Sequence, residues 1–119
     1  MRRFLFLEIM TFAWAIAILW LSLFYLPVGI PGDGSGFLLH LGAYFFLAVL
    51  AMHAYNHKTH LWPIVIIAVT YGIALEVLQF FVGRVPSVSD AIANMAGVIT
   101  AAVLVQNIEK LNSKKKSKA

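Results

Sequence analysis

Hydrophobic residues occupy four long stretches of the chain, and short polar or turn-forming sequences separate these stretches. The stretches run over residues 4–26, 37–55, 61–82 and 90–108, with PVGIPGDGSG, NHKTH and GRVPSVS between them. A helix needs about 20 apolar residues to cross the ~30 Å hydrocarbon core of a bilayer, and proline and glycine in the first and third connections favour turns. The pattern therefore predicts an all-α polytopic membrane protein, built as a bundle of four transmembrane helices.

The first stretch is expected to remain in the protein as a membrane span. Its apolar run is longer than the roughly 7–15 residues of a signal-peptide core, and no A-x-A-like cleavage sequence follows it. Residues 1–119 are predicted to form one membrane domain, in which residues 109–119 are a basic cytoplasmic tail.

The composition supports a membrane protein and excludes several other classes. Of the 119 residues, 61% are hydrophobic and 12% are charged, whereas about a quarter of the residues in a soluble domain are charged. The chain has no cysteine, which excludes disulfides and thiolate metal sites. The sequence has no basic patch interleaved with aromatic residues, so we expect a lipid bilayer and no nucleic acid as partner.

Positive charges are unevenly distributed between the two ends of the predicted bundle. With both termini inside, eight of the nine Lys and Arg residues fall on the inner side, and only Arg84 lies in an outer loop. Short cytoplasmic loops carry an excess of Lys and Arg, so this bias predicts an N-in, C-in orientation. The lysine-rich tail would then meet anionic lipid of the inner leaflet.

Polar and small residues recur at helical spacing in the third and fourth stretches. A charged side chain in hydrocarbon is costly, so Glu76 is expected to face the interior of the bundle. Small residues allow two helix backbones to approach closely, and we expect the two stripes to pack face to face. At i, i+4, i+7 and i+11, the stripes consist of Gly72, Glu76, Gln79 and Gly83, and of Asp90, Asn94, Gly97 and Ala101.

These stripes are predicted to bring several polar groups to one depth near the outer face of the membrane. An intramembrane carboxyl group such as that of Glu76 is by default a functional candidate. Tyr44 by itself would also fit an interfacial aromatic belt. The expected set comprises His40 and Tyr44 from the second stretch, Glu76, Gln79, Asp90 and Asn94 from the stripes, and Arg84 above them in the loop.

Several of these residues also have structural interpretations. Ser87 and Asp90 fit the N-cap and N3 positions of a capping box. Arg84 fits a side chain that snorkels to the interface or forms an ion pair with Asp90. Asn94 and Gln79 fit interhelical hydrogen bonds worth about 0.6 kcal/mol each.

The order of these motifs resembles the VanZ-like family of small bacterial membrane proteins. HLGAY in the second stretch and EVLQFFVGRVPSVSDAIANMAGV across the third and fourth carry the resemblance. The family pattern has His-x-x-x-Tyr, Glu-x-x-Gln, Gly-Arg, Ser-x-x-Asp and Asn-x-x-Gly elements. Family members often carry an Asp-Lys pair just before the histidine, where this chain has Ser35 and Gly36. The pattern corresponds here to His40 and Tyr44, Glu76 and Gln79, Gly83 and Arg84, Ser87 and Asp90, and Asn94 and Gly97.

Together with the predicted orientation, the resemblance implies a multi-pass protein of the bacterial cytoplasmic membrane whose site faces the extracytoplasmic side. The family's namesake is associated with reduced sensitivity to the glycopeptide antibiotic teicoplanin. We therefore expect an outward-facing polar pocket that binds or acts on an envelope component, such as a lipid-linked or phosphate-bearing head group.

Within such a pocket the residues divide into two expected roles. Arg84 and His40 would contact the anion, while Glu76 and Asp90 would transfer a proton or bind a cation. The sequence offers no evident serine or cysteine nucleophile with a base, so whether the protein is an enzyme stays open. We assign no metal ligands and leave any cofactor open. The catalytic candidates are Glu76, Asp90 and His40, and the binding candidates are Arg84, Gln79, Asn94, Tyr44 and Ser87.

Two other classes of function remain open. A non-catalytic helper or scaffold would pack against a larger envelope protein, and its polar residues would only join helices. A proton-coupled transporter subunit would use Glu76, yet below it only Thr70 and Thr100 continue the polar residues toward the inner side. Substitutions in a scaffold would cost folded protein, whereas substitutions in a site would leave the protein abundant and inactive.

Overall fold

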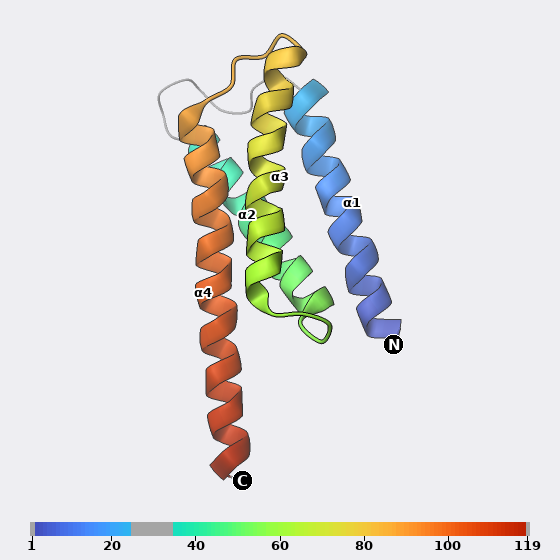
Figure 1. Ribbon diagram of the computed structural model, residues 1–119, viewed down its shortest axis with the longest axis vertical. Coiled ribbons are helices and arrows are strands. Elements are labelled where there is room, and N and C mark those ends of the chain that lie inside the picture. Colours follow the sequence, from blue (N-terminus) through green and yellow to red (C-terminus); the bar gives the residue numbers. More distant parts are fainter. Residues whose placement is uncertain (1, 25–34, 119) are drawn as a thin grey trace.

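Four α-helices make up the protein in the computed structural model, which describes residues 2–24 and 35–118 (Figure 1). The helices are α1 (Arg2–Phe24), α2 (Ser35–Tyr55), α3 (Leu61–Phe81) and α4 (Val88–Lys118). Each is long and apolar enough to cross a membrane, so the predicted all-α fold with four spans is confirmed. The end of the first predicted span and most of the connection after it lie outside the described residues. The N-in, C-in orientation stays a prediction.

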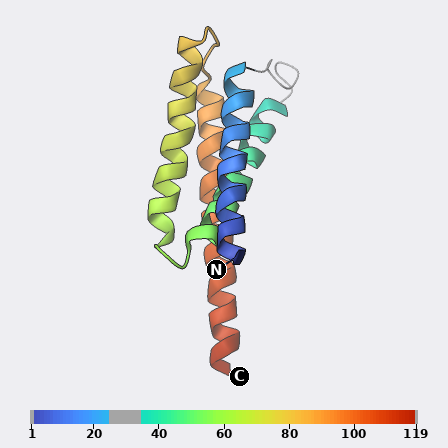
Figure 2. The same cartoon turned by 90° about the vertical axis from the view of Figure 1, so that its right-hand side faces the viewer.

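α2 and α3 occupy the middle of the bundle. Each contacts the three other helices, whereas α1 and α4 do not contact each other within the described part of the chain. Both chain ends lie opposite the α3–α4 connection, as two views of the bundle show (Figures 1 and 2). Tyr44, Met52 and Val98 are fully buried, while large apolar side chains such as Phe6 and Trp62 are exposed. An apolar exterior of this extent is typical of a surface that faces lipid.

α4 is the longest helix and continues beyond its predicted span. The span was expected to end at residue 108, whereas the helix has 31 residues and ends at Lys118. Residues 109–118 contain neither proline nor glycine, and their lysines are good helix formers. The basic tail therefore forms an exposed extension of α4, and the longest dimension of the protein is 56 Å.

The two polar stripes pack only in part as predicted. A Cβ atom placed on Gly72 of α3 would lie 3.2 Å from Cβ of Asn94, so the stripes do meet there. A Cβ atom placed on Gly97 would instead lie 2.9 Å from the backbone nitrogen of Phe45 in α2. The missing side chain at Gly97 thus lets α4 approach α2 rather than α3, and α2 with α4 forms the most extensive helix pair.

Candidate functional site

A tight turn after α3 carries the chain back across the end of the bundle. Gly83 has a φ angle of 80°, which glycine adopts without a Cβ clash. The Arg84 N–H donates to the Gln79 carbonyl at 2.9 Å, and the Gly83 N–H donates to the Phe80 carbonyl at 3.3 Å. These two bonds are the Schellman pattern. The turn therefore ends α3 and directs the following residues back toward it.

Ser87 links the start of α4 to Glu76. Its Oγ accepts a hydrogen bond from the Asp90 N–H at 3.3 Å, which confirms the predicted N-cap bond. In a reciprocal capping box, the side chain at N3 accepts from the N-cap N–H. Here the Ser87 N–H donates instead to Oε2 of Glu76 at 3.1 Å. The Asp90 carboxylate is therefore free to contact another group.

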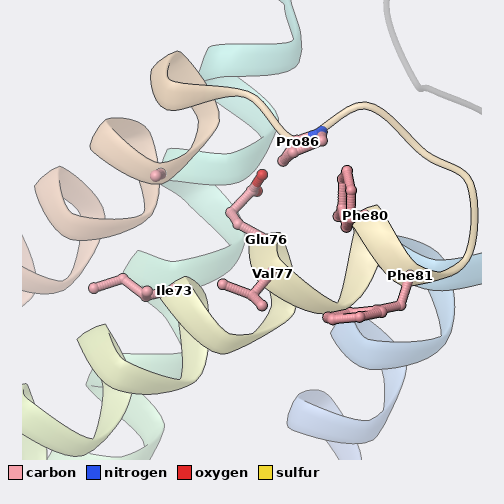
Figure 3. Close-up of a pocket in the computed structure, with 7 residues that line it drawn as sticks. Ile73, Glu76, Val77, Phe80, Phe81 and Pro86 are labelled. Carbon is pink, nitrogen blue, oxygen red and sulfur yellow. The ribbon is translucent and has the colours of Figure 1, made fainter.

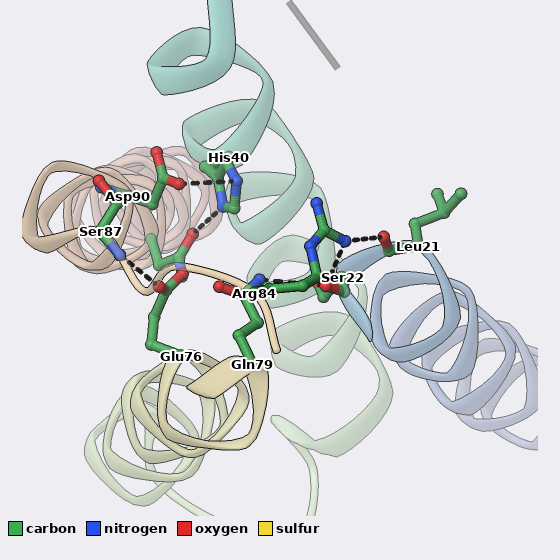
Figure 4. Close-up of polar contacts among 9 residues, drawn as sticks. Leu21, Ser22, His40, Glu76, Gln79, Arg84, Ser87 and Asp90 are labelled. Atoms are coloured by element: carbon green, nitrogen blue, oxygen red, sulfur yellow. Dashed lines mark hydrogen bonds and ion pairs between the residues drawn. The ribbon is translucent and has the colours of Figure 1, made fainter. Parts of the chain in front are cut away.

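His40 of α2 is the residue that the Asp90 carboxylate faces. Nε2 of His40 lies 3.5 Å from Oδ2 of Asp90, and Nδ1 lies 3.0 Å from Oδ1 of Asn94. Because an amide oxygen accepts and never donates, Nδ1 carries a proton in this contact. The imidazole is thus held between two residues of α4 (Figure 4).

We refer to His40, Glu76, Asp90 and Asn94 as the polar cluster. His40, Glu76 and Asp90 each offer one nitrogen or oxygen atom, and these three atoms lie within 4.8 Å of one another. Glu76 and Asn94 are buried, whereas the side chains of His40 and Asp90 are 26% and 30% exposed. The polar cluster therefore joins α2, α3 and α4, with two members in the interior and two accessible from outside.

Gln79 and Arg84 point away from the polar cluster, toward α1. Nη1 of Arg84 donates to the carbonyls of Ser22 at 2.6 Å and Leu21 at 3.3 Å, and Nε2 of Gln79 donates to the Ser22 carbonyl at 3.2 Å. The last four carbonyl groups of a helix lack intrahelical partners, and a cation there complements the helix dipole. Arg84 thus caps α1 and forms no ion pair with Asp90 within the described residues (Figure 4).

Replacement of Arg84 by alanine is expected to loosen α1 from the bundle. The loss of the charge-assisted hydrogen bonds should lower the free energy of unfolding by about 1–2 kcal/mol. Backbone hydrogen exchange in α1 of the detergent-solubilised protein measures the change. Arg84→Lys retains a cation and should lose less. Unaltered exchange in the alanine variant would contradict the capping role.

Tyr44 lies one turn deeper in α2 than His40. Its side chain is 2% exposed, and a Cβ atom placed on Gly72 would lie 3.0 Å from its Cε1 atom. Residues of an interfacial aromatic belt face the boundary between lipid and water, so that interpretation of Tyr44 is wrong. The side chain packs beneath the polar cluster and supports the contact between α2 and α3.

Two aromatic residues attach α1 in a way that the hydrophobic pattern does not reveal. Nε1 of Trp14 donates to the Ala43 carbonyl at 3.0 Å, and the hydroxyl of Tyr71 donates to the Ala15 carbonyl at 2.5 Å. The signal in the sequence is weak: an indole N–H or a phenol O–H in an apolar segment needs an acceptor. These bonds hold α1 against α2 and α3, although α1 contributes no residue to the polar cluster.

Of three comparisons with known proteins, one found a match. A comparison with curated proteins and one with solved structures gave no significant match. The profile of the VanZ/LLP1 family matches residues 4–109. This match includes every member of the polar cluster and confirms the resemblance found in the sequence. The chain therefore belongs to the VanZ/LLP1 family.

Proposed function

We propose that the polar cluster is the place where this membrane protein binds, or acts on, a lipid-linked envelope component with a phosphate head group. The observation that carries the proposal is the position of Glu76, which belongs both to the polar cluster and to the wall of an apolar groove. The proposal places the chain in the bacterial cytoplasmic membrane with the cluster on the extracytoplasmic side. The charge distribution supports this orientation, because Arg84, in the α3–α4 connection, is the only Lys or Arg at that end of the bundle within the described residues.

The groove is shallow, has an entirely apolar exposed lining and lies on the outside of the bundle between α3 and α4. Glu76 is its only ionisable lining residue, and the Glu76 carboxyl group lies close to Pro86 (Figure 3). A hydrocarbon chain suits such a surface within a bilayer, because tight packing against apolar side chains replaces contacts with other lipids. The groove has a volume of about 360 Å³ and is lined by Ile73, Glu76, Val77, Phe80, Phe81, Pro86 and Ala91.

A lipid chain in this groove would bring its head group to the polar cluster. His40 and Asp90 are partly exposed and are therefore accessible to a head group. Arg84 uses Nη1 to cap α1, but a guanidinium has further N–H donors, which suit phosphate oxygens. Glu76 and Asp90 would transfer a proton or hold a cation beside the bound group.

The association of the family's namesake with teicoplanin suggests a cellular context for this activity. We propose that the chain alters sensitivity to the antibiotic through the polar cluster. A scaffold is the alternative, in which the cluster only joins helices and its substitution costs folded protein rather than ligand binding.

The proposal predicts a preference for lipids that carry phosphate. Polyprenyl phosphate should bind the purified full chain about tenfold more tightly, or better, than the polyprenol of the same length. The reason is that only the phosphate offers an anion to the cluster and to Arg84. Native mass spectrometry of the protein in detergent measures both affinities. Equal affinities for the two lipids would contradict recognition of the head group.

Two alanine-to-phenylalanine variants test the groove separately from the head group. Ala91 lines the groove beside Glu76, so Ala91→Phe should weaken the binding of polyprenyl phosphate by about tenfold or more. Ala102 lines a second apolar groove, together with Leu61 and Trp62 at the other end of α3. Ala102→Phe is therefore the matched control and should bind as the unaltered protein does. If both variants lost affinity for polyprenyl phosphate, or if neither did, binding in the first groove would be contradicted.

A further inference from the structure

We propose that His40, Glu76 and Asp90 bind one divalent transition-metal ion of the Zn²⁺ or Mn²⁺ class. The three side chains come from α2, α3 and α4 and offer one nitrogen and two oxygens within 4.8 Å of one another. A mixture of imidazole and carboxylate suits such ions, whereas Mg²⁺ and Ca²⁺ prefer oxygen ligands alone. The ligands lie far apart in the sequence, so no short motif predicts this site.

The spacing of the ligand atoms fits a single ion. Nε2 of His40 and Oδ2 of Asp90 are 3.5 Å apart, which is long for a hydrogen bond. Two ligands of a tetrahedral ion with bonds of about 2.1 Å are about 3.4 Å apart. The ligand atoms of the three residues lie within 4.8 Å of one another, so the carboxylate oxygen of Glu76 would move by at most about 1.4 Å to complete such a set.

Asn94 orients His40 for metal binding. The protonated Nδ1 donates to Oδ1 of Asn94 at 3.0 Å, so in the neutral ring Nε2 carries the lone pair, on the side that faces Asp90. Metal-bound histidines commonly donate their other ring N–H to an oxygen atom, which fixes the tautomer and the ring orientation. The Asn94 side chain is 2% exposed and therefore holds this donor in a well-packed environment.

Glu76 provides a second indication of a bound cation. The residue is 7% exposed, and its Oε2 accepts from the Ser87 N–H, whereas its Oε1 has no hydrogen-bond donor within the described residues. Two carboxylates this close together repel each other, and a positive charge between them relieves the repulsion. The guanidinium of Arg84 is turned toward α1. A divalent ion between Glu76 and Asp90 would supply this positive charge.

The ion would also have room for a further ligand. Three protein ligands leave at least one coordination position for another molecule. Glu76 lines the apolar groove with its carbon atoms and offers its carboxylate to the ion, so a head group that reached past this side chain would meet that position. This use of the ion rests on the proposed function: the ion would bind a phosphate oxygen and offset the repulsion between the phosphate and the two carboxylates.

Metal binding is tested on the full chain, purified in detergent without a polyhistidine tag and without added lipid. After a chelator has removed metal, equilibrium dialysis against Zn²⁺ or Mn²⁺ should leave about one ion per chain. His40→Ala, Glu76→Gln and Asp90→Asn should each weaken binding by about tenfold or more. Asn94→Leu should weaken it by about 10–100-fold, because it removes the acceptor for Nδ1 of His40.

His53 provides the matched control for these variants. It is exposed on α2, and its Nδ1 lies 2.8 Å from the Val49 carbonyl, so His53→Ala should keep the full affinity. Fewer than about 0.2 ions per chain, or undiminished binding in the three ligand variants, would overturn the metal site. If a ligand variant does not fold, the test uses the unaltered protein, whose unfolding temperature must rise when the ion is added. An unchanged unfolding temperature would overturn the metal site.

The metal site and the proposed function can fail separately. A chain that binds the ion but does not prefer polyprenyl phosphate contradicts the proposed function and leaves the metal site intact. Equal binding of polyprenyl phosphate with chelator and with Zn²⁺ overturns the role of the ion as a ligand of the head group. A tenfold or larger loss of lipid affinity in chelator supports both.

Discussion

Gly97→Leu is expected to abolish the folded four-helix bundle. A Cβ atom at this position would lie 2.9 Å from the backbone nitrogen of Phe45 and 3.2 Å from the carbonyl carbon of Leu41. Backbone atoms inside a helix cannot move aside as the end of a side chain can, so α4 would have to separate from α2. We expect a loss of on the order of 3 kcal/mol or more. Size-exclusion chromatography of the detergent extract measures the yield of folded protein.

Gly42→Leu is the matched control for the glycine at position 97. Gly42 also lies on a membrane-spanning helix, but nothing lies within 4 Å of a Cβ atom placed there. Leucine is a better helix former than glycine, so this variant should give a normal or higher yield. A normal yield from Gly97→Leu would contradict the close packing of α2 and α4.

The helices could be predicted from the sequence because a bilayer restricts what can cross it. A spanning segment must satisfy its backbone hydrogen bonds internally and must be about 20 residues long. α3 accordingly matches its predicted range to within one residue at its end, Phe81. The length of α4 was less predictable, because residues 109–118 lie beyond the apolar run and only their helix propensity continues the helix.

The faces on which the helices meet could be predicted only in part. A small residue indicates close approach to some neighbour, but it does not say which neighbour. Gly72 meets the α4 stripe at Asn94, whereas Gly97 faces α2. Which neighbour a small residue packs against depends on how well whole helix surfaces fit together. The spacing of residues along one helix gives no information about that fit.

The grouping of polar residues was more predictable than their individual partners. His40, Glu76, Asp90 and Asn94 meet because a buried polar group is costly unless it finds another. Arg84 instead donates hydrogen bonds to the free carbonyls at the end of α1. The sequence of α1 contains no sign that a residue from the α3–α4 connection caps this helix, so that partner could not be predicted.

Asp90→Asn is expected to keep the protein folded and to weaken its binding of phosphate lipid. The backbone N–H of Asp90, and not its carboxylate, makes the N-cap bond to Ser87. The substitution should therefore leave the free energy of unfolding within about 0.5 kcal/mol. It removes the negative charge that faces His40, and we expect the affinity for polyprenyl phosphate to fall by about tenfold or more. Native mass spectrometry and thermal unfolding measure the two quantities.

The sign of the affinity change separates a specific site from simple charge repulsion. A carboxylate beside a bound phosphate repels it by on the order of 1 kcal/mol in a well-solvated environment. If the polar cluster acted only through its net charge, Asp90→Asn would therefore strengthen the binding of polyprenyl phosphate. A weaker affinity requires that the Asp90 carboxylate act through a positive group, either His40 or a bound cation.

Ser87→Ala is expected to lower the stability of the protein and to leave its lipid affinity unchanged, which is the opposite of the result expected for Asp90→Asn. It removes the Oγ acceptor of the N-cap bond and should lower the free energy of unfolding by about 1 kcal/mol. The backbone N–H that holds Glu76 remains, so the lipid affinity should stay unchanged. A scaffold would give another result: Asp90→Asn would cost folded protein as Ser87→Ala does, and neither would alter lipid binding. The first turn of α4 thus separates two tasks, because Ser87 holds the helix and thereby leaves the Asp90 carboxylate to the polar cluster.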